Sequence, residues 1–156
     1  MTKPDTSHVK IIAVNRKARH DYTVESEFEA GMVLLGSEVK ALREGRANLK
    51  DSYAKIKNGE LFVFQLHISE YPQAGRFNHD PLRVRKLLMH KHEIMRLVGK
   101  IQSKGLTLIP LSLYFKEGRA KISVALCQGK KKFDKRRALQ EREQKREMDQ
   151  LKRRRR

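Results

Sequence analysis

Alternation of apolar and polar positions predicts that most of residues 1–128 form short β-strands. Residues 120–127 have an apolar side chain at every second position, which is the period of a strand with one buried face. Residues 106–115 are the predicted partner strand, joined through the turn at 116–118. Asn58-Gly59 separates two further β-type stretches, 52–57 and 60–68, and is the sequence signal for a two-residue hairpin turn.

Three more strands are predicted over residues 9–14, 22–28 and 32–35, and two segments have helical signals instead. Residues 37–44 begin at Ser37, a favourable N-cap, and stop before a glycine. Residues 85–104 contain apolar side chains at i, i+3, i+4 and i+7, and a glycine follows. Short strands with few helices, in no alternating order, predict a mainly β fold, a small antiparallel barrel or sandwich.

The distribution of charge divides the chain into a body, residues 1–128, and a basic tail, residues 129–156. The chain has 36 Lys and Arg against 18 Asp and Glu, a net charge of +18. The 28 residues of the tail hold 14 basic and 5 acidic residues, so half of that net charge, +9, lies there. Such a segment has too few apolar residues to bury a core of its own.

The tail nevertheless consists largely of good helix formers, with Asp134 as a candidate cap and favourable i,i+4 charge pairs. We expect residues 129 to about 152 to be disordered in the free protein and to become helical on contact with a partner. Arg153–Arg156 are expected to form a frayed basic end.

The composition also excludes several kinds of function. A single cysteine, Cys127, permits neither an intramolecular disulfide nor a thiolate zinc cluster, and a reducing cytoplasmic location is the default. No apolar run approaches the roughly 20 residues that span a bilayer, so no membrane segment is expected. His90 and His92, two apart on the predicted helix, should point in different directions, and His79 has no identifiable partner. Phosphate-loop, nucleophile and magnesium motifs are also missing, which predicts a binding protein without cofactor or metal, and not an enzyme.

The surplus of positive charge indicates a polyanionic partner. Lys40 and Arg43, at i,i+3 on the first predicted helix, would share one face and could bind two phosphates. Small barrels with basic faces commonly bind structured or single-stranded RNA. The basic groups of the body are Arg16, Lys17 and Arg19; Lys40, Arg43 and Arg46; and Arg83, Arg85 and Lys86.

Six blocks of sequence identify a known family more closely than composition can. They are residues 15–22, 27–31, 36–43, 47–53, 85–88 and 129–136. In this order and spacing they resemble the bacterial small protein B family, SmpB, the protein partner of transfer-messenger RNA (tmRNA). The resemblance extends over about residues 8–148 and implies an OB-type barrel with two or three short helices.

The resemblance also implies a function, ribosome rescue by trans-translation. The body would hold the tRNA-like domain of tmRNA, which alanyl-tRNA synthetase charges and elongation factor Tu accompanies to a stalled ribosome. The tail would enter the vacant mRNA channel as a helix, and the protein is expected to act as a monomer. The alternatives are a small basic ribosomal protein, another OB protein that binds structured RNA, and an RNA-processing enzyme.

Residues of this chain that match the family pattern are expected at the RNA. Glu29 would accept hydrogen bonds from base amines or hold a basic neighbour, and Leu88 would either contact an unstacked base or lie in the core. His90 stands where related sequences often have Asn, and Phe133 keeps an aromatic ring for stacking. The other expected RNA contacts are Asn15, Arg19, His20 and Asn48, and the expected ribosome contacts are Lys130, Lys131, Lys132, Phe133, Asp134, Lys135 and Arg136.

Overall fold

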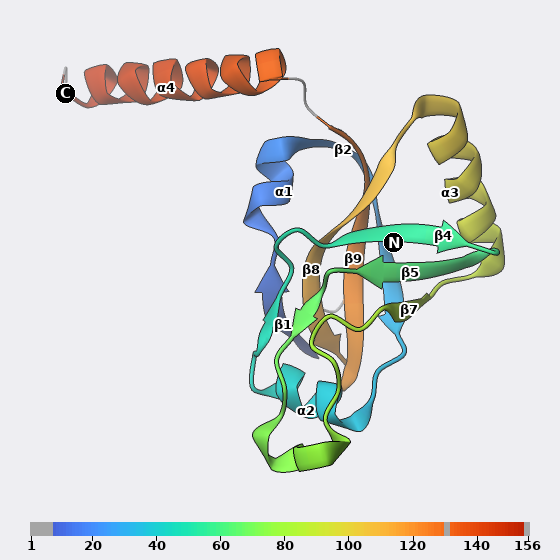
Figure 1. Cartoon of the computed structure of the whole chain (residues 1–156). Helices are drawn as coiled ribbons and strands as arrows, with labels where there is room; N and C mark the ends of the chain where they lie inside the picture. The colour runs from blue at the N-terminus through green and yellow to red at the C-terminus, as the bar shows by residue number, and fades with distance from the viewer. Residues whose placement is uncertain (1–7, 130–131, 155–156) are drawn as a thin grey trace.

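The computed structural model describes residues 8–129 and 132–154, and Figure 1 shows a ring of antiparallel strands with a separate C-terminal helix. Strand β8 pairs with β4 on one side and with β9 on the other, and this closes the ring in the order β8-β4-β5-β7-β2-β9. The ring strands are β2 (Tyr22–Met32), β4 (Tyr53–Lys57), β5 (Glu60–Phe64), β7 (Arg85–Leu88), β8 (Thr107–Lys116) and β9 (Arg119–Gly129). The prediction of a mainly β antiparallel barrel is confirmed.

Two further pairings lie outside the ring. Strand β1 (Val9–Val14) pairs with the C-terminal half of β8, and the short β3 (Ala47–Asn48) pairs with β6 (His67–Ile68). The predicted strand over 60–68 is therefore two strands, broken after Phe64, where Gln65 has a positive φ of 59°. The predicted strand over 32–35 is wrong, because β2 runs on to Met32 and no strand follows it.

Local turn chemistry explains both main hairpins. Asn58 and Gly59 have φ values of 52° and 74°, the positive values that a two-residue hairpin turn with matching twist requires. Glu117 and Gly118, with φ values of 52° and 75°, join β8 to β9 in the same way. Both predicted turns are confirmed.

The helices differ from the prediction at their N-terminal ends. Helix α2 (Gly36–Arg43) starts one residue before Ser37, and Glu38 accepts a hydrogen bond from the Leu35 N–H at 2.8 Å. Helix α3 (Lys91–Lys104) ends at Gly105, as predicted, but residues 85–88 are strand β7 and not helix. Their side chains alternate between the interior and the surface, which is the period of a strand. Two helical segments are not predicted from the sequence: α1 (Arg16–Asp21) and the 3₁₀ segment η2 (Pro72–Phe77).

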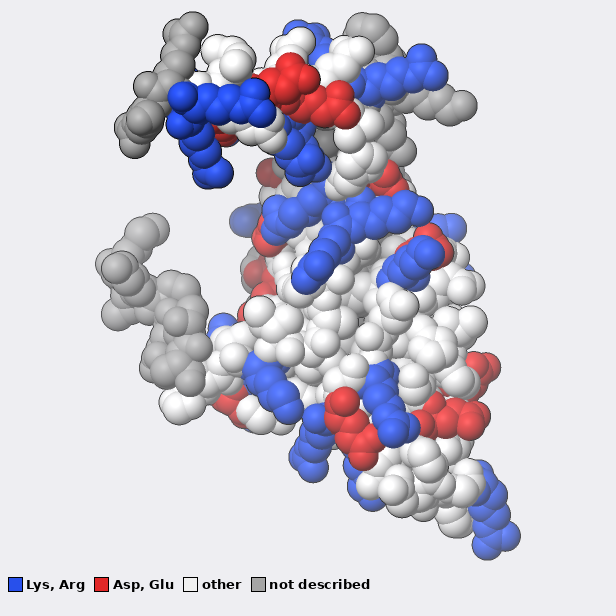
Figure 2. Space-filling view, turned by 90° about the vertical axis from the view of Figure 1, so that its left-hand side faces the viewer, with Lys and Arg blue, Asp and Glu red and all other residues white. Residues whose placement is uncertain are grey.

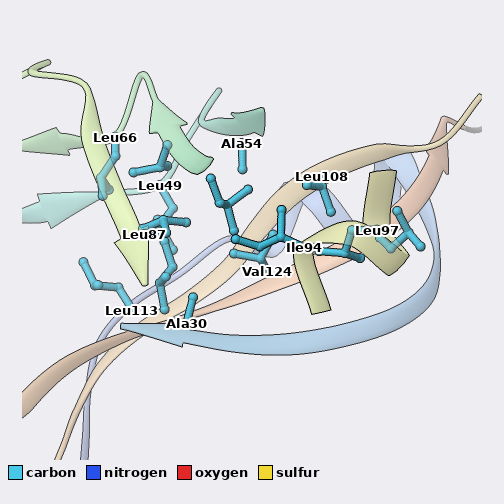
Figure 3. Packing of buried hydrophobic residues seen from close by; sticks show 14 of the residues in the cluster. Ala30, Leu49, Ala54, Leu66, Leu87, Ile94, Leu97, Leu108, Leu113 and Val124 are labelled. Atoms are coloured by element: carbon cyan, nitrogen blue, oxygen red, sulfur yellow. The ribbon is translucent and has the colours of Figure 1, made fainter. Parts of the chain in front are cut away.

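The core fills the ring and continues into two helices. Figure 3 shows Leu87, Leu108 and Val124 of the strands converging with Ile94 and Leu97 of α3. Helix α2 adds two fully buried residues to the same cluster. A second cluster lies on the outer face of β8 and β9, under α1; its buried members are Ala18, Ile109, Leu111, Ala125 and Cys127.

A buried ion pair joins α2 to β7. The side chains of Glu38 and Arg85 are both completely buried, and the Arg85 Nε–H donates to Glu38 Oε2. Arg85 Nη1 also donates to the Leu66 carbonyl at 2.6 Å, and Arg83 Nη2 donates to Glu38 Oε1 at 2.5 Å. Burial alone would raise the pKa of Glu38, but the hydrogen bonds from Arg83, Leu35 and Arg85 outweigh it and hold that pKa below its usual value. Glu38 is therefore ionised in the fold.

Helix α4 (Lys132–Arg154) projects away from the barrel in Figure 1, and its described side chains are all exposed. A helical tail is confirmed, although the helix begins two residues before Asp134 and continues through Arg153 and Arg154. Disorder of the free tail stays a prediction. None of the helices in the described part of the chain combines the length and apolar character needed to cross a membrane.

Replacing Glu38 by Gln should destabilise the fold by about 3–5 kcal/mol, because the Arg85 charge would stay buried without its partner. Urea unfolding followed by circular dichroism measures the change. Glu60→Gln is the matched control, since Glu60 forms a half-exposed pair with Lys86 that is worth at most about 1 kcal/mol. Equal losses in the two variants would contradict a special role for the buried pair.

The same pair predicts an acid dependence of stability. The pKa of Glu38 is lower in the folded than in the unfolded chain, so the unfolded chain takes up a proton first as the pH falls. The stabilisation is fully present above the ordinary pKa of 4.5 and is lost as the pH falls below it through the folded-state value. The difference in unfolding free energy between wild type and Glu38→Gln should therefore shrink with acidification, and a constant difference would contradict it.

Candidate nucleic-acid interface

Asn15 positions the first group of predicted RNA contacts but is itself an interior residue. Only 8% of its surface is exposed, and its side-chain oxygen accepts from the Ala18 N–H at 3.2 Å, which caps α1. Its side-chain nitrogen donates to the carbonyls of Pro110 and Leu49, at 3.0 and 3.4 Å. Because these bonds use the amide within the protein, Asn15 has a structural role in place of the predicted RNA contact.

Helix α1, held in this way, presents the basic residues that follow. Arg16, Lys17 and Arg19 are exposed, and the Arg19 guanidinium donates to Glu27 on β2 at 3.1 Å. His20 is half-buried, and its ring Nδ1 lies 3.0 Å from Asp21 Oδ1. Alternation along β2 puts Glu27 and Glu29 on the same outward face, so Arg19 lies along the face that carries Glu29.

Glu29 is held by two residues of β8. The Tyr114 hydroxyl donates to Glu29 Oε2 at 2.5 Å, and Lys116 Nζ lies 3.5 Å from Glu29 Oε1. Burial and then the bond to Glu29 raise the pKa of Tyr114, so the phenol stays protonated and keeps donating. These contacts orient the exposed carboxylate, which leaves it free to accept further hydrogen bonds from a partner.

Leu88 is on the surface and not in the core. Its side chain is 51% exposed, and its strand β7 pairs with β2 at Gly31. A Cβ at Gly31 would lie 3.3 Å from Leu88 Cβ, so glycine permits the close approach of the two strands. Beside them is a hollow of about 370 Å³ whose lining includes Arg119 and Lys121. An apolar side chain beside cationic groups suits an unstacked base with its phosphates.

The histidines near α2 and α3 make contacts within the fold. His90 precedes α3 as its N-cap, so its ring stacks on that of His92, 5.6 Å between centroids, and the expectation that the two point apart is wrong. His79 is buried, accepts from the Ser37 hydroxyl at 2.9 Å and donates to the Ile68 carbonyl at 2.9 Å, which ties α2 to β6. Within residues 8–129 and 132–154, no group of three potential metal ligands was found.

The basic residues of the second group lie at the other end of the barrel, around α2. Lys40 is exposed, with Nζ 5.6 Å from the centre of the Tyr71 ring, and Arg43 is exposed on the next turn. Arg46 pairs with Glu44 at 3.1 Å, and the Asn48 side chain accepts from the Lys50 N–H at 2.8 Å. These residues are available to a partner.

The third basic group divides between the interior and the surface. Arg85 is completely buried on Glu38, so the structure gives it a structural role in place of the predicted RNA contact. Arg83 is 31% exposed and shares Glu38, whereas Lys86 is 42% exposed and pairs with Glu60 at 3.0 Å. Of the three, Lys86 is the most accessible to a phosphate.

Positive charge therefore gathers in more than one place. Figure 1 shows α1 and α2 at opposite ends of the barrel, and Figure 2 shows lysines and arginines above and below a broad uncharged area. The predicted contacts do not form one compact patch. Arg19, Glu29 and Leu88 follow the outer face of β2 and β7, and the α2 group forms a second surface.

The predicted tail contacts lie at the start of α4 or just before it. Lys130 and Lys131 are outside the described residues, and Lys132, Phe133, Asp134 and Lys135 belong to the first turns of the helix. Arg136 is exposed.

Sequence reasoning missed Tyr114 and Lys116 beside Glu29, and Arg119 and Lys121 beside the hollow at Leu88. The alternation in residues 106–127 could have put these side chains on the outer face of their strands. Their closeness to Glu29 or to Leu88 depends on the pairing of β2 with β9 and of β9 with β8, which local pattern does not reveal.

Comparison with known proteins finds relatives over most of the chain. The profile of the SmpB protein family matches residues 12–154. An SsrA-binding protein of Syntrophobacter fumaroxidans is 57% identical over 155 residues, 99% of this chain and 96% of its own length. SsrA-binding proteins of Desulfitobacterium hafniense and Clostridium botulinum are 58% and 60% identical, over 90% and 88% of both chains.

A solved structure is similar as well. It is described as "tmRNA-SmpB: a journey to the center of the bacterial ribosome", has a TM-score of 0.64 and 49% sequence identity, and covers 76% of this chain and 84% of its own.

Replacing Asn15 by Ala should lower the unfolding free energy by about 1–2 kcal/mol, because α1 loses its cap and two buried carbonyls lose a donor. Thermal and urea unfolding measure the loss. Asn48→Ala removes an exposed hydrogen bond of the same kind and should cost less than about 0.5 kcal/mol. If both variants were as stable as the wild type, Asn15 would not anchor α1.

Proposed function

The chain belongs to the SmpB protein family, and on that basis we propose that it binds the tRNA-like domain of tmRNA and delivers it to stalled ribosomes for trans-translation. The barrel is the RNA-binding part, and the tail occupies the mRNA channel that a truncated message leaves empty. The observation that carries the proposal is family membership over residues 12–154. It is supported by the arrangement of the chain, in which a basic helix projects away from a basic barrel. The protein acts by binding and not as an enzyme.

The barrel face along β2 and β7 suits a folded RNA with exposed bases. Arg19 supplies positive charge, Glu29 offers an oriented acceptor, and Leu88 gives an apolar contact beside a hollow. Acceptors and apolar groups read bases, whereas arginine and lysine position the phosphate backbone. A face that combines these groups can recognise one particular RNA surface and does not bind through charge alone.

Helix α4 supports a role inside an RNA-lined channel. Its described residues include many basic side chains and only scattered apolar groups, and those whose exposure is described are all exposed. The barrel contributes little to the stability of such a helix, whereas surrounding phosphates would stabilise it by neutralising its positive charge. It can therefore report whether the channel is vacant, because message in the channel would exclude it.

The remaining parts of the proposal follow from this role. Alanyl-tRNA synthetase and elongation factor Tu act through the bound tmRNA, the protein works as a monomer, and its place is the cytoplasm. A permanent ribosomal protein would co-sediment with all ribosomes in equal amounts. A rescue factor should be substoichiometric and enriched on ribosomes stalled at the end of a message.

The two basic groups of the barrel can be tested as pairs. Arg16→Ala with Arg19→Ala, and Lys40→Ala with Arg43→Ala, should each weaken binding of a transcript of the tRNA-like domain. Each lost phosphate contact should reduce the slope of log affinity against log salt by about 0.7–0.9. Filter binding at several salt concentrations measures this, and thermal unfolding should be nearly unchanged.

The matched control removes two arginines from α4. Arg142→Ala with Arg146→Ala makes the same change in net charge and should leave binding of the isolated transcript as in the wild type. If a double substitution in the barrel lowered the melting temperature but not the affinity for the transcript, those two residues would stabilise the fold and would not contact the RNA.

The tail is tested by placing Pro at Leu139. Proline removes a helical hydrogen bond and costs about 3 kcal/mol in the helix, yet leaves the barrel untouched. The variant should bind tmRNA and reach stalled ribosomes normally but fail to pass the nascent chain to the charged alanine. A peptidyl-transfer assay on ribosomes stalled at a message end measures this.

Leu139→Ala removes the same exposed side chain but preserves the helix, so it should transfer at nearly the wild-type rate. Wild-type transfer by the Pro variant would show that the tail does not act as a helix.

A further inference from the structure

A group of half-buried aromatic residues lies on the outer face of β4 and β5, away from Glu29. We define this aromatic strip by Tyr53, Phe62 and Phe64 with Lys55, Lys57 and Lys86. The rings of Tyr53 and Phe64 are parallel, 8° between their planes, with centroids 5.3 Å apart. Phe62 stands opposite Lys55 on β4 and opposite Lys86 on β7. Tyr53 and Phe64 therefore form one cross-strand pair, and Phe62 lies in the next pair along the same face, between two lysines.

The two phenylalanines of the strip are not core residues, whereas Tyr53 packs against the second hydrophobic cluster. Phe62 and Phe64 point outward, are half-buried, and belong to neither hydrophobic cluster of the barrel. The inward positions of the same strand, Leu61 and Val63, are fully buried and supply its share of the core. Two large apolar rings are thus kept at a surface whose other residues include three lysines.

The charge around the rings selects the kind of partner. Lys55 Nζ lies 5.5 Å from the centre of the Tyr53 ring, and Lys57 Nζ lies 4.9 Å from that of Phe64. Lys86 pairs with Glu60, so Lys55 and Lys57 carry the unbalanced charge. Flat rings with cations beside them suit nucleotides, because the base stacks on the ring while the ammonium groups hold its phosphate. An apolar protein partner would have to leave these cations without counter-charges.

The aromatic strip is continuous with the proposed RNA-binding face. In the sheet the order of strands is β4-β5-β7-β2, and these strands follow one another around the barrel in Figure 1. Strand β7 points Lys86 and Leu88 outward, the first next to Phe62 and the second next to Gly31 of β2. An RNA bound at Glu29 and Leu88 therefore needs to cross only β7 to reach the rings.

We propose that unpaired bases of the same RNA, tmRNA, stack on the aromatic strip. This inference rests on the proposed function and adds to it a second contact, made by stacking, on the β4–β5 side of the barrel. Stacking on an aromatic side chain accepts any base, so the aromatic strip adds affinity and orientation while the β2 face supplies selection.

A tryptophan reporter tests the contact directly. The chain contains no tryptophan, so Phe64→Trp keeps an aromatic ring in the strip and introduces a single indole fluorophore. We expect its fluorescence to be quenched when a transcript of the tmRNA tRNA-like domain is added, with a midpoint equal to the dissociation constant from filter binding. Full binding by filter assay with unchanged fluorescence would overturn the proposal.

A second variant measures what the rings contribute. Phe62→Leu with Phe64→Leu should weaken binding of the transcript about tenfold or more, with the salt slope unchanged because no phosphate contact is lost. The melting temperature should fall only slightly, because the stack on Tyr53 is lost but no core residue is. Phe77→Leu is the matched control: this ring is 79% exposed in η2, and its loss should not change affinity. A fall in melting temperature without a loss of affinity would assign the rings to the fold and overturn the proposal.

The two proposals can fail separately. If the wild-type protein did not bind the transcript, the proposed function itself would be wrong. If the wild type bound and the double variant bound equally well, only the stacking contact would be wrong.

Discussion

The buried ion pair between Glu38 and Arg85 is the interaction on which the rest of this barrel depends. Both charges are removed from water, and neither could stay there without the other and the hydrogen bonds around them. The pair holds α2 against β7 and, through the Leu66 carbonyl, the segment after β5. A purely apolar contact could slide along this junction, whereas hydrogen bonds to a carboxylate fix its geometry.

This junction determines where the functional side chains stand. Because Arg85 points inward, alternation along β7 turns Lys86 and Leu88 outward, toward the aromatic strip and the face of Glu29. Because Glu38 points inward, Lys40 and Arg43 lie on the exposed side of α2. The same two buried charges thus orient residues on one strand and one helix. The cap at Asn15 performs the corresponding task for α1 at the other end of the barrel.

Separation of the charge between barrel and tail lets a strongly basic protein fold. Half of the net charge of +18 lies in the tail, whose described helix keeps away from the barrel, so this charge does not oppose closure of the core. Within the barrel, acidic partners such as Glu27 and Glu60 offset some of the remaining charge. The exposed cations that are left define where an RNA can bind.

The sequence by itself determined the elements whose causes are local. Asn58-Gly59 specified its hairpin through positive φ, Gly105 stopped α3, and the helix-forming residues of the tail produced α4. The six blocks of sequence that resemble the SmpB family also predicted the family and its barrel. Local pattern fails at residues 85–88: it predicts a helix with Arg85 on its surface, although Arg85 is the buried partner of Glu38, 47 positions away.

Only the tertiary structure decided which residues meet. Tyr114 orients Glu29 across 85 positions, and Asn15 reaches Pro110 across 95. These contacts depend on strand order and register, which arise when the ring closes and not from any short stretch of sequence. A charged residue is predicted to be exposed because burial of an unpaired charge is costly. Only the folded chain shows that Glu38 and Arg85 are paired with each other and can therefore be buried.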